Sequence, residues 1–97
     1  MLVHIVCWKY KPEVPDELRD KHRHSLATLP SVIDNIVRFN VGADILHLER
    51  SFDTGLIAVF PERDALDRYT EHPEHQKVAA IGRELSQQVV SVDFLDE

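Results

Sequence analysis

The chain has 97 residues and a formal net charge of −6, because 17 acidic side chains outnumber 11 basic ones. An acidic surface without a basic stripe repels phosphate backbones, which argues against nucleic acid as a partner. No apolar run approaches the ~20 residues that a membrane-spanning helix needs, and the opening residues lack the pattern of a signal peptide. The single cysteine, Cys7, excludes an internal disulfide. We therefore expect one cytoplasmic domain over residues 1–97, without a membrane partner.

Residues 2–10 are rich in strand-forming side chains and are largely apolar at both odd and even positions, which predicts a first strand that is covered on both faces. A helix is predicted to follow from Pro15, because acidic residues occupy its first turn. Apolar residues then recur at helical spacing, with Leu18 and His22 on the inward stripe, until Pro30 ends the helix.

The middle of the chain predicts two more strands. Residues 36–41, with Val37, Phe39 and Val41 on one face, predict the second strand, which Gly42 is expected to stop. Residues 43–53 form a long connection, of a length that often carries function or mobility. Residues 55–60 are continuously apolar, which is typical of a central strand.

The last third predicts a helix from Pro61, a second helix after Pro73 that runs to Leu85, and a strand over residues 89–95. The resulting order β-α-β-β-α-α-β is typical of the α+β ferredoxin-like fold, a split β-α-β arrangement in which helices cover one face of a four-stranded antiparallel sheet. The other face would expose a large apolar patch. A second copy packed sheet to sheet would cover it, so we expect a homodimer that forms an α/β barrel.

Tyr69 to His75 form the most informative segment, because it holds a phenol and two imidazoles around a proline. The residue before a proline leaves the α region, and proline is accepted in the first turn of a helix. Tyr69 should therefore close one helix, His72 should lie in the break, and His75 should fall in the first turn of the next helix. There the helix dipole disfavours a charged imidazole, which would suit a general base.

Two further histidines, His4 and His22, are predicted to point from the first strand and the first helix toward the interior, where they could line a pocket or form buried hydrogen bonds. No metal site is predicted, because His72 and His75 straddle a broken turn and no cysteine or nearby carboxylate completes a ligand set. No cofactor is expected.

Several segments together resemble one family. They are the opening Val3-His4-Ile5-Val6-Cys7-Trp8-Lys9-Tyr10-Lys11, Pro30, the spaced motif Phe60-x5-Leu66-x2-Tyr69-x2-His72-Pro73-x-His75, and the closing Val90-x-Val92-Asp93-Phe94. This pattern is similar to the stress-responsive A/B barrel family, also called the Dabb domain. The resemblance implies a dimeric α+β barrel, and it implies little about chemistry, because most members have no assigned reaction.

One relative class, the plant cyclase that closes olivetolic acid, is similar to this chain at His4, Tyr69, His72 and His75. The resemblance implies that Tyr69 and His75 form an acid/base pair. Where that cyclase has a further histidine near the start of the third strand, this chain has Thr54 and Gly55. The departure argues against a shared substrate, since fold and function are separable.

Three hypotheses follow. The favoured one is a homodimer in which each protomer binds a small hydrophobic or aromatic-like molecule in a pocket lined by His4, His22, Tyr69, His72 and His75. The alternatives are a cofactor-free cyclase or isomerase that uses Tyr69 and His75, and a structural, stress-linked dimer without catalysis. A pocket reached by both Tyr69 and His75 would favour the enzyme, and a filled one would favour the structural protein.

Overall fold

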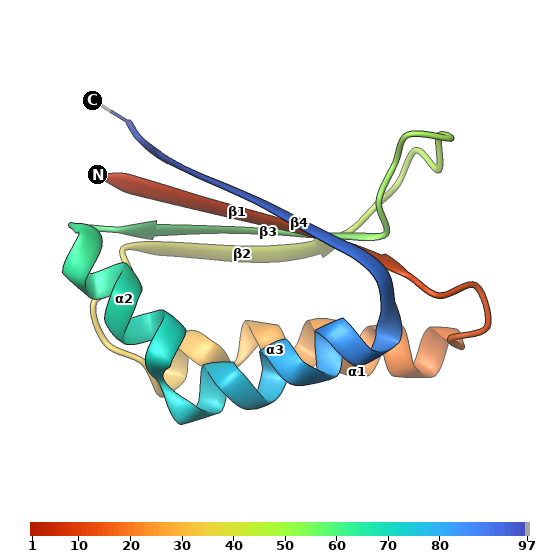
Figure 1. Ribbon diagram of the computed structural model, residues 1–97, viewed down its shortest axis with the longest axis horizontal. Helices are drawn as coiled ribbons and strands as arrows, with labels where there is room; N and C mark the ends of the chain where they lie inside the picture. Colours follow the sequence, from red (N-terminus) through yellow and green to blue (C-terminus); the bar gives the residue numbers. More distant parts are fainter. Residues whose placement is uncertain (97) are drawn as a thin grey trace.

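A computed structural model describes residues 1–96 as a four-stranded antiparallel sheet with helices on one face (Figure 1). The fold is the α+β ferredoxin-like fold that the order of elements predicts. The elements are β1 (Leu2–Tyr10), α1 (Asp16–Ala27), a 3-10 turn (Leu29–Ser31), β2 (Arg38–Ala43), β3 (Thr54–Phe60), α2 (Arg63–Glu71), α3 (Pro73–Leu85) and β4 (Ser86–Leu95). Within residues 1–96, no helix is both long and apolar enough to cross a membrane.

The sheet has the strand order β2-β3-β1-β4, so β1 lies in its middle. Val3 of β1 is level with Val59 of β3 and with Phe94 of β4, and Ile5 is level with Ile57. Since side chains alternate along a strand, these residues share the face that carries no helix, while the even-numbered residues of β1 face the helices. β1 is therefore largely apolar on two sides: its even-numbered residues face the core, and its odd-numbered residues lie on the side of the sheet without helices.

The core lies between the sheet and the helices. Its strand residues are fully or nearly fully buried, and its helix residues come from the inward stripes of α1, α2 and α3. The main members are Trp8, Tyr10, Leu26, Leu29, Leu56, Ala58, Phe60, Leu66, Tyr69 and Val78.

Several element boundaries differ from those that the sequence predicts. The first helix ends at Ala27 and a separate 3-10 turn contains Pro30, and Leu18 is 41% exposed although helical spacing places it inward. β2 starts at Arg38 and runs through Gly42, because Gly42 pairs with Gly55 of β3 and the ladder continues past it. β4 begins at Ser86, directly after α3, whereas β-branched composition alone places its start three residues later.

The face without helices exposes large apolar side chains. On β4, Val92 is 53% and Phe94 46% exposed. The connection between β2 and β3 rises on the same side of the sheet, away from the helices (Figure 1), and Ile45 in this connection is 84% exposed. This side of the sheet, which carries Val3, Ile5, Ile57, Val59, Val92 and Phe94, is called the outer face below, and Val3 is its buried member with 7% exposure.

Candidate functional site

The junction of α2 and α3 places His72 in the break and His75 in the first turn of α3, as the sequence predicts, while α2 runs past Tyr69 to Glu71. His72 has φ −63° and ψ 134°, so it leaves the helical region and serves both as the C-cap of α2 and as the N-cap of α3. Its Nδ1 accepts a hydrogen bond from the backbone N–H of Glu74 at 3.1 Å, and Pro73 follows in the first turn. The imidazole thus satisfies one of the unpaired N–H groups of α3, a task usually carried out by Ser, Thr, Asp or Asn.

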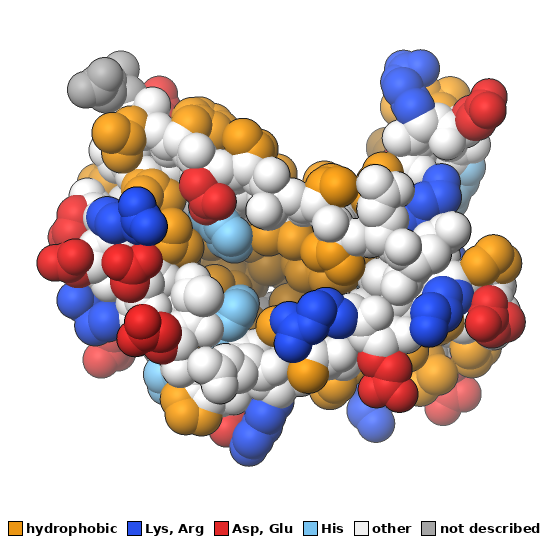
Figure 2. Space-filling model, viewed as in Figure 1, with side chains coloured by type: hydrophobic (Ala, Val, Ile, Leu, Met, Phe, Trp, Pro, Cys, Tyr) orange, Lys and Arg blue, Asp and Glu red, His pale blue; other side chains and the backbone are white. Residues whose placement is uncertain are grey.

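A cavity of about 260 Å³ lies between the sheet and α2 and α3. Its opening is visible in the space-filling view as a hollow between β4 and the helices, with histidine and apolar side chains inside (Figure 2). The volume is near the low end of ligand-binding pockets, which suits a small molecule. The residues that line it are His4, Val6, Trp8, Leu26, Leu56, Tyr69, Thr70, His75, Ala79, Arg83, Val89 and Ser91. This space is called the inner cavity below.

Tyr69 and His75 meet at the wall of the inner cavity, with ring centroids 4.4 Å apart. Nδ1 of His75 lies 3.1 Å from the carbonyl oxygen of Thr70. A carbonyl only accepts, so Nδ1 carries the proton and Nε2 keeps a lone pair in the neutral ring. Burial, reinforced by nearby positive charge, lowers the pKa of His75 below 6.5, although the bond to Thr70 opposes this. A neutral imidazole with a free Nε2 lone pair can accept a proton.

The Tyr69 hydroxyl can donate a hydrogen bond, whereas Nε2 of His75 can accept one. The side chain is only 1% exposed, and burial raises the pKa of the phenol far above its usual value of 10, so the hydroxyl stays protonated. None of the hydrogen bonds among residues 1–96 uses this hydroxyl, although its residue lines the inner cavity. Tyr69 can therefore donate a hydrogen bond to a bound carbonyl or oxyanion, while His75 accepts a proton.

His4 reaches the same cavity from the middle of β1. Its ring lies 6.1 Å from that of Tyr69, edge to face. On its other side, Nδ1 lies 2.5 Å from Oδ1 of Asp93, which is the residue level with His4 on β4. The carboxylate accepts a hydrogen bond from Nδ1–H and so fixes the orientation of the imidazole, as second partners of functional histidines commonly do.

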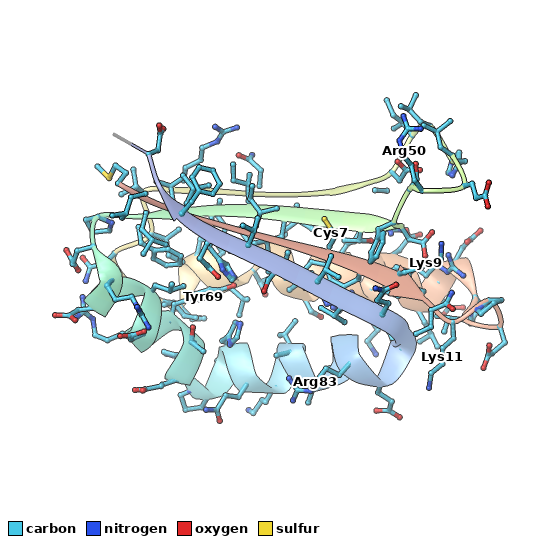
Figure 3. The ribbon with its side chains drawn as sticks, turned by 45° about the horizontal axis from the view of Figure 1, so that its top comes forward. Cys7, Lys9, Lys11, Arg50, Tyr69 and Arg83 are labelled. Carbon is cyan, nitrogen blue, oxygen red and sulfur yellow. The ribbon has the colours of Figure 1, made fainter. Side chains whose placement is uncertain are left out.

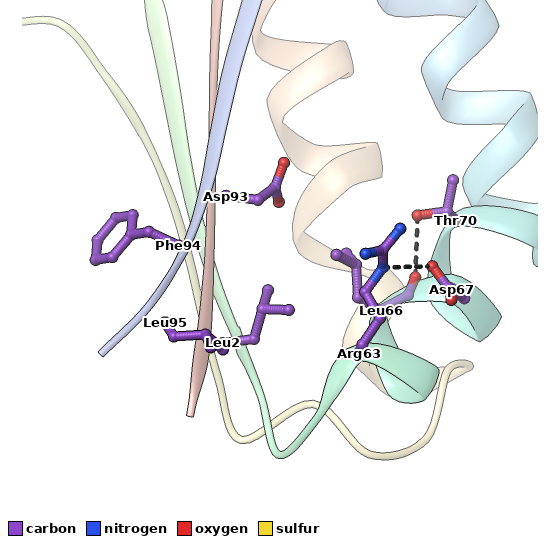
Figure 4. Close-up of a pocket in the computed structure, with 8 residues that line it drawn as sticks. All are labelled: Leu2, Arg63, Leu66, Asp67, Thr70, Asp93, Phe94 and Leu95. Carbon is purple, nitrogen blue, oxygen red and sulfur yellow. Dashed lines mark hydrogen bonds and ion pairs between the residues drawn. The ribbon is translucent and has the colours of Figure 1, made fainter. Parts of the chain in front are cut away.

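A second, wider cavity of about 620 Å³ adjoins the first, since Thr70 lines both. It lies between the end of β4 and α2, and in the close-up the Asp93 carboxylate points across it toward α2 while Phe94 points to the other side of the sheet (Figure 4). Its charged groups largely pair with each other, as Arg63 does with Asp67 at 3.2 Å. The inner cavity is the better candidate site, because Tyr69 and His75 line it together with largely apolar side chains, and the Tyr69 hydroxyl and Nε2 of His75 have no hydrogen-bond partner within residues 1–96.

The structure brings three of the five predicted site residues together: His4, Tyr69 and His75. His72 caps α3 and does not line the inner cavity. His22, in the middle of α1, does not line the inner cavity either. Its Nδ1 is 2.7 Å from the Tyr10 hydroxyl, which in turn is 3.0 Å from Oγ1 of Thr54. Burial, with the nearby charge of Arg23, lowers the pKa of His22 to about 4.

Sequence reasoning missed two residues that belong to the site, Asp93 and Arg83. Arg83 could have been found, because His75, Ala79 and Arg83 are four residues apart and so lie on one face of α3. Asp93 has no such local signal, since its place beside His4 depends on the register of two strands 89 residues apart. Within residues 1–96, no three His, Cys, Asp or Glu side chains are grouped so that they could hold a metal ion.

The fold and the cavity define a ferredoxin-like α+β domain with a ligand-sized space between its sheet and its helices. The chain belongs to the family described as the Stress responsive A/B Barrel Domain, or Dabb, whose model matches residues 2–96. The family that the sequence motifs predict is thereby confirmed. Among curated protein sequences, no match was found.

Solved structures with the same fold include two proteins of unknown function that are described as dimeric. One, from Thermobifida fusca, is 24% identical with a TM-score of 0.87, over 96% of this chain and 88% of that one. The other, from Bacteroides fragilis, is 26% identical with a TM-score of 0.83, over 96% and 93%. A third is the hydroxynitrile lyase of Passiflora edulis, which is 14% identical with a TM-score of 0.88, over 99% and 93%. This last likeness shows a shared fold.

Proposed function

We propose that this protein is a homodimer in which each protomer binds a small hydrophobic or aromatic-like molecule in the inner cavity. The observation that carries the proposal is the convergence of His4, Tyr69 and His75, from three different elements, on one largely apolar space. Binding of an apolar ring there would bury it against Val6, Leu56 and the aromatic side chains, and the polar groups would fix its orientation.

The test uses 2-naphthamide, a neutral aromatic probe, and isothermal titration calorimetry. We expect saturable binding with one site per protomer. Ala79 lines the inner cavity and has no hydrogen-bonding side chain, so Ala79→Leu should fill the space and abolish binding while the protein stays folded. The matched control is Ala80→Leu, at an exposed position of the same helix, which should bind as the wild type does. Equal binding by both variants would place the ligand elsewhere.

The dimer is proposed to form through the outer face. Two solved structures with this fold are described as dimeric, and the exposed valines and Phe94 offer the apolar area that a stable interface needs. Val92→Asp would put a charge into such an interface and should yield a monomer that is largely unfolded. Val37→Asp, at an exposed valine outside this face, should remain dimeric. A stable folded wild-type monomer at micromolar concentration in analytical ultracentrifugation would overturn this assignment.

A second candidate function, cofactor-free proton transfer as in a cyclase or isomerase, is favoured by one observation. The His75 ring has its Nδ1 engaged and its Nε2 lone pair free, beside a protonated Tyr69. Together these groups could remove a proton next to a carbonyl and stabilise the resulting enolate. A hydroxynitrile lyase has this fold, so the fold accommodates catalysis, but that likeness is at the level of fold alone.

Proton transfer can be tested with acetophenone in D2O, because exchange of its methyl protons is visible by NMR. We expect the wild type to accelerate exchange over the buffer, and His75→Ala and Tyr69→Phe to remove the acceleration. The exchange-deficient variants should still bind 2-naphthamide. If the wild type binds the probe without any accelerated exchange, the protein binds ligands without this chemistry. If neither binding nor exchange occurs, the third hypothesis, a structural dimer, gains support.

A further inference from the structure

Arg83 is one of two arginines that have no hydrogen-bond or ion-pair partner within residues 1–96, and of these two only Arg83 lines the inner cavity. Five arginines form hydrogen bonds or ion pairs with side chains or backbone groups: Arg19, Arg23, Arg38, Arg63 and Arg68. Among residues 1–96, the guanidinium of Arg83 takes part in no ion pair or hydrogen bond. The same holds for Arg50, which lies in the β2–β3 connection on the opposite side of the sheet (Figure 3).

The position of Arg83 directs its charge to the inner cavity. It lies on α3 in line with His75 and Ala79, two turns beyond His75, and all three residues line the cavity. The lining contains no Asp or Glu, so Arg83 is its only permanently charged side chain within residues 1–96. The positive charge reaches the candidate base, because Arg83 is one of the groups that lower the pKa of His75.

A lone guanidinium at the edge of an apolar space is suited to an anion. The chain has 17 acidic side chains and a net charge of −6, so acidic partners for an arginine are abundant. Five of the other arginines do have hydrogen-bond or ion-pair partners. The planar guanidinium binds carboxylates through two parallel hydrogen bonds. Arg83 is an exposed residue, so water screens such a pair in part.

We propose that the ligand of the inner cavity is an amphiphilic anion: an apolar or aromatic body that fills the space between β1 and α3, with a carboxylate or equivalent oxyanion that pairs with Arg83. This assignment rests on the proposed function, because it names the chemical class of ligand for the same cavity. It also orients the ligand, since the anionic end lies at Arg83 and the other end of the molecule approaches Tyr69 and His75.

Two probes of equal shape test the charge requirement. The anion 2-naphthoate and the neutral 2-naphthamide share one ring system, so any difference in affinity reports the charged group. We expect 2-naphthoate to bind about fivefold more tightly at low salt, as a partly exposed charge-assisted pair would provide. Added salt should weaken 2-naphthoate and leave 2-naphthamide unchanged.

Variants assign the effect to one side chain. Arg83→Gln should remove the preference for 2-naphthoate and leave the affinity for 2-naphthamide intact. Arg50→Gln removes the same charge from the net balance at a remote place, so it should keep the preference in full. A preference for 2-naphthoate that survives in Arg83→Gln, or that is lost equally in Arg50→Gln, would overturn the role of Arg83.

A site-specific readout comes from His75. Burial is the main cause of the lowered pKa of His75, and the charge of Arg83 adds to it, so an anion bound at Arg83 should raise the pKa of His75. In NMR titrations, saturating 2-naphthoate should shift the His75 pKa upward more than saturating 2-naphthamide does. Binding of 2-naphthamide with no preference for the anion and no such shift would refute the anionic ligand and leave the proposed function standing. Failure of both probes to bind would reject the two together.

Discussion

Two Tyr–His pairs lie on the helix-covered side of the same sheet, and they have opposite characters. Tyr10 and His22 are fully buried and joined by a hydrogen bond of 2.7 Å, and the Tyr10 hydroxyl has a second partner in Thr54. Tyr69 and His75 also touch, but the Tyr69 hydroxyl has no hydrogen-bond partner within residues 1–96 and Nε2 of His75 is free beside a cavity. We call the first the enclosed pair, because its side chains are fully buried and bonded to each other, although Nε2 of His22 has no hydrogen-bond partner within residues 1–96. We call the second the open pair, because its two residues line the inner cavity.

The comparison shows how structural polar residues can be told from functional ones when both pairs consist of a tyrosine and a histidine. A polar group whose partners lie within the protein contributes to stability, so its removal should cost stability. A polar group that faces a cavity and has no protein partner contributes little to the free energy of unfolding. Its removal should therefore change stability very little and should affect mainly ligand binding. The following predictions measure this contrast, from the largest effect to the smallest.

Acid should lower the free energy of unfolding mainly through His22 of the enclosed pair. The pKa of His22 falls from 6.5 in the unfolded chain to about 4 in the fold, so between these values the unfolded chain binds more protons. The contribution of His22 is therefore complete above pH 6.5 and is lost as the pH falls toward 4, with a cost of up to about 3 kcal/mol. The lowered pKa of His75 acts in the same direction. The measurement is the free energy of unfolding in urea as a function of pH.

His22→Gln should flatten most of this pH dependence, whereas His24→Gln, at an exposed position on the same helix, should leave it unchanged. An equally steep loss of stability in His22→Gln would show that other groups control acid unfolding.

Gly82 lets α3 approach the enclosed pair. A Cβ at this position would lie 2.8 Å from Nε2 of His22 and 2.8 Å from Nε1 of Trp8, and both rings are packed. Gly82→Ala should therefore destabilise the fold by about 2 kcal/mol, although alanine gains up to about 1 kcal/mol over glycine in a helix. Chemical denaturation gives the value. In a His22→Ala background the same change should cost clearly less, and an unchanged cost would mean that the contact with His22 is not the cause.

Removing one hydroxyl from each tyrosine compares the two regions directly. Tyr10→Phe deletes a hydroxyl with two partners and leaves buried polar atoms unpaired, so we expect a loss of about 1–2 kcal/mol. Tyr69→Phe deletes a hydroxyl without a protein partner, so the free energy of unfolding should change by less than about 0.5 kcal/mol. Each variant is the control for the other in thermal denaturation, and equal costs would contradict the division into enclosed and open pairs.

The two histidines of the elbow, which is the α2–α3 junction from Tyr69 to His75, should also differ in their effect on stability. His72→Ala removes the N-cap of α3 and should cost about 1 kcal/mol, which lowers the midpoint of a domain of this size by roughly 4–8 °C. His75→Ala removes one partly exposed hydrogen bond and should cost about 0.5 kcal/mol, while any accelerated exchange of acetophenone protons disappears. A larger loss of stability from His75→Ala than from His72→Ala would make His75 the structural residue of the elbow.

Local chemistry made part of this structure predictable. β1 matches residues 2–10 because its composition has no competing signal, and the elbow matches because Pro73 allows few backbone conformations. Gly42 misled the prediction of β2, because glycine weakens a strand without ending it, and the ladder with β3 continues through Gly42–Gly55 to Ala43–Thr54. The burial of Leu18 failed because helical spacing defines a stripe and does not say how far the neighbouring elements cover it.

The candidate site was predictable only where it is local in sequence. Tyr69 and His75 are six residues apart, and their meeting follows from the turn between two helices. The separation of His22 from His4 depends on how α1 crosses the sheet, which no spacing within either element records. The pairing of His4 with Asp93 depends likewise on strand register, which is set by the whole sheet.

The central position of β1 has a consequence for synthesis on the ribosome. Its two neighbours in the sheet, β3 and β4, are made after it, and β4 ends 35 positions after β3. At about 5–20 residues per second, one edge of an apolar strand remains unpaired for a few seconds after β3 is complete. During this time Val3 and Ile5 stand at an open edge, where another chain could pair with them. We expect nascent chains that stop before Ser86 to aggregate or recruit chaperones, and chains that include β4 to be released as folded protein.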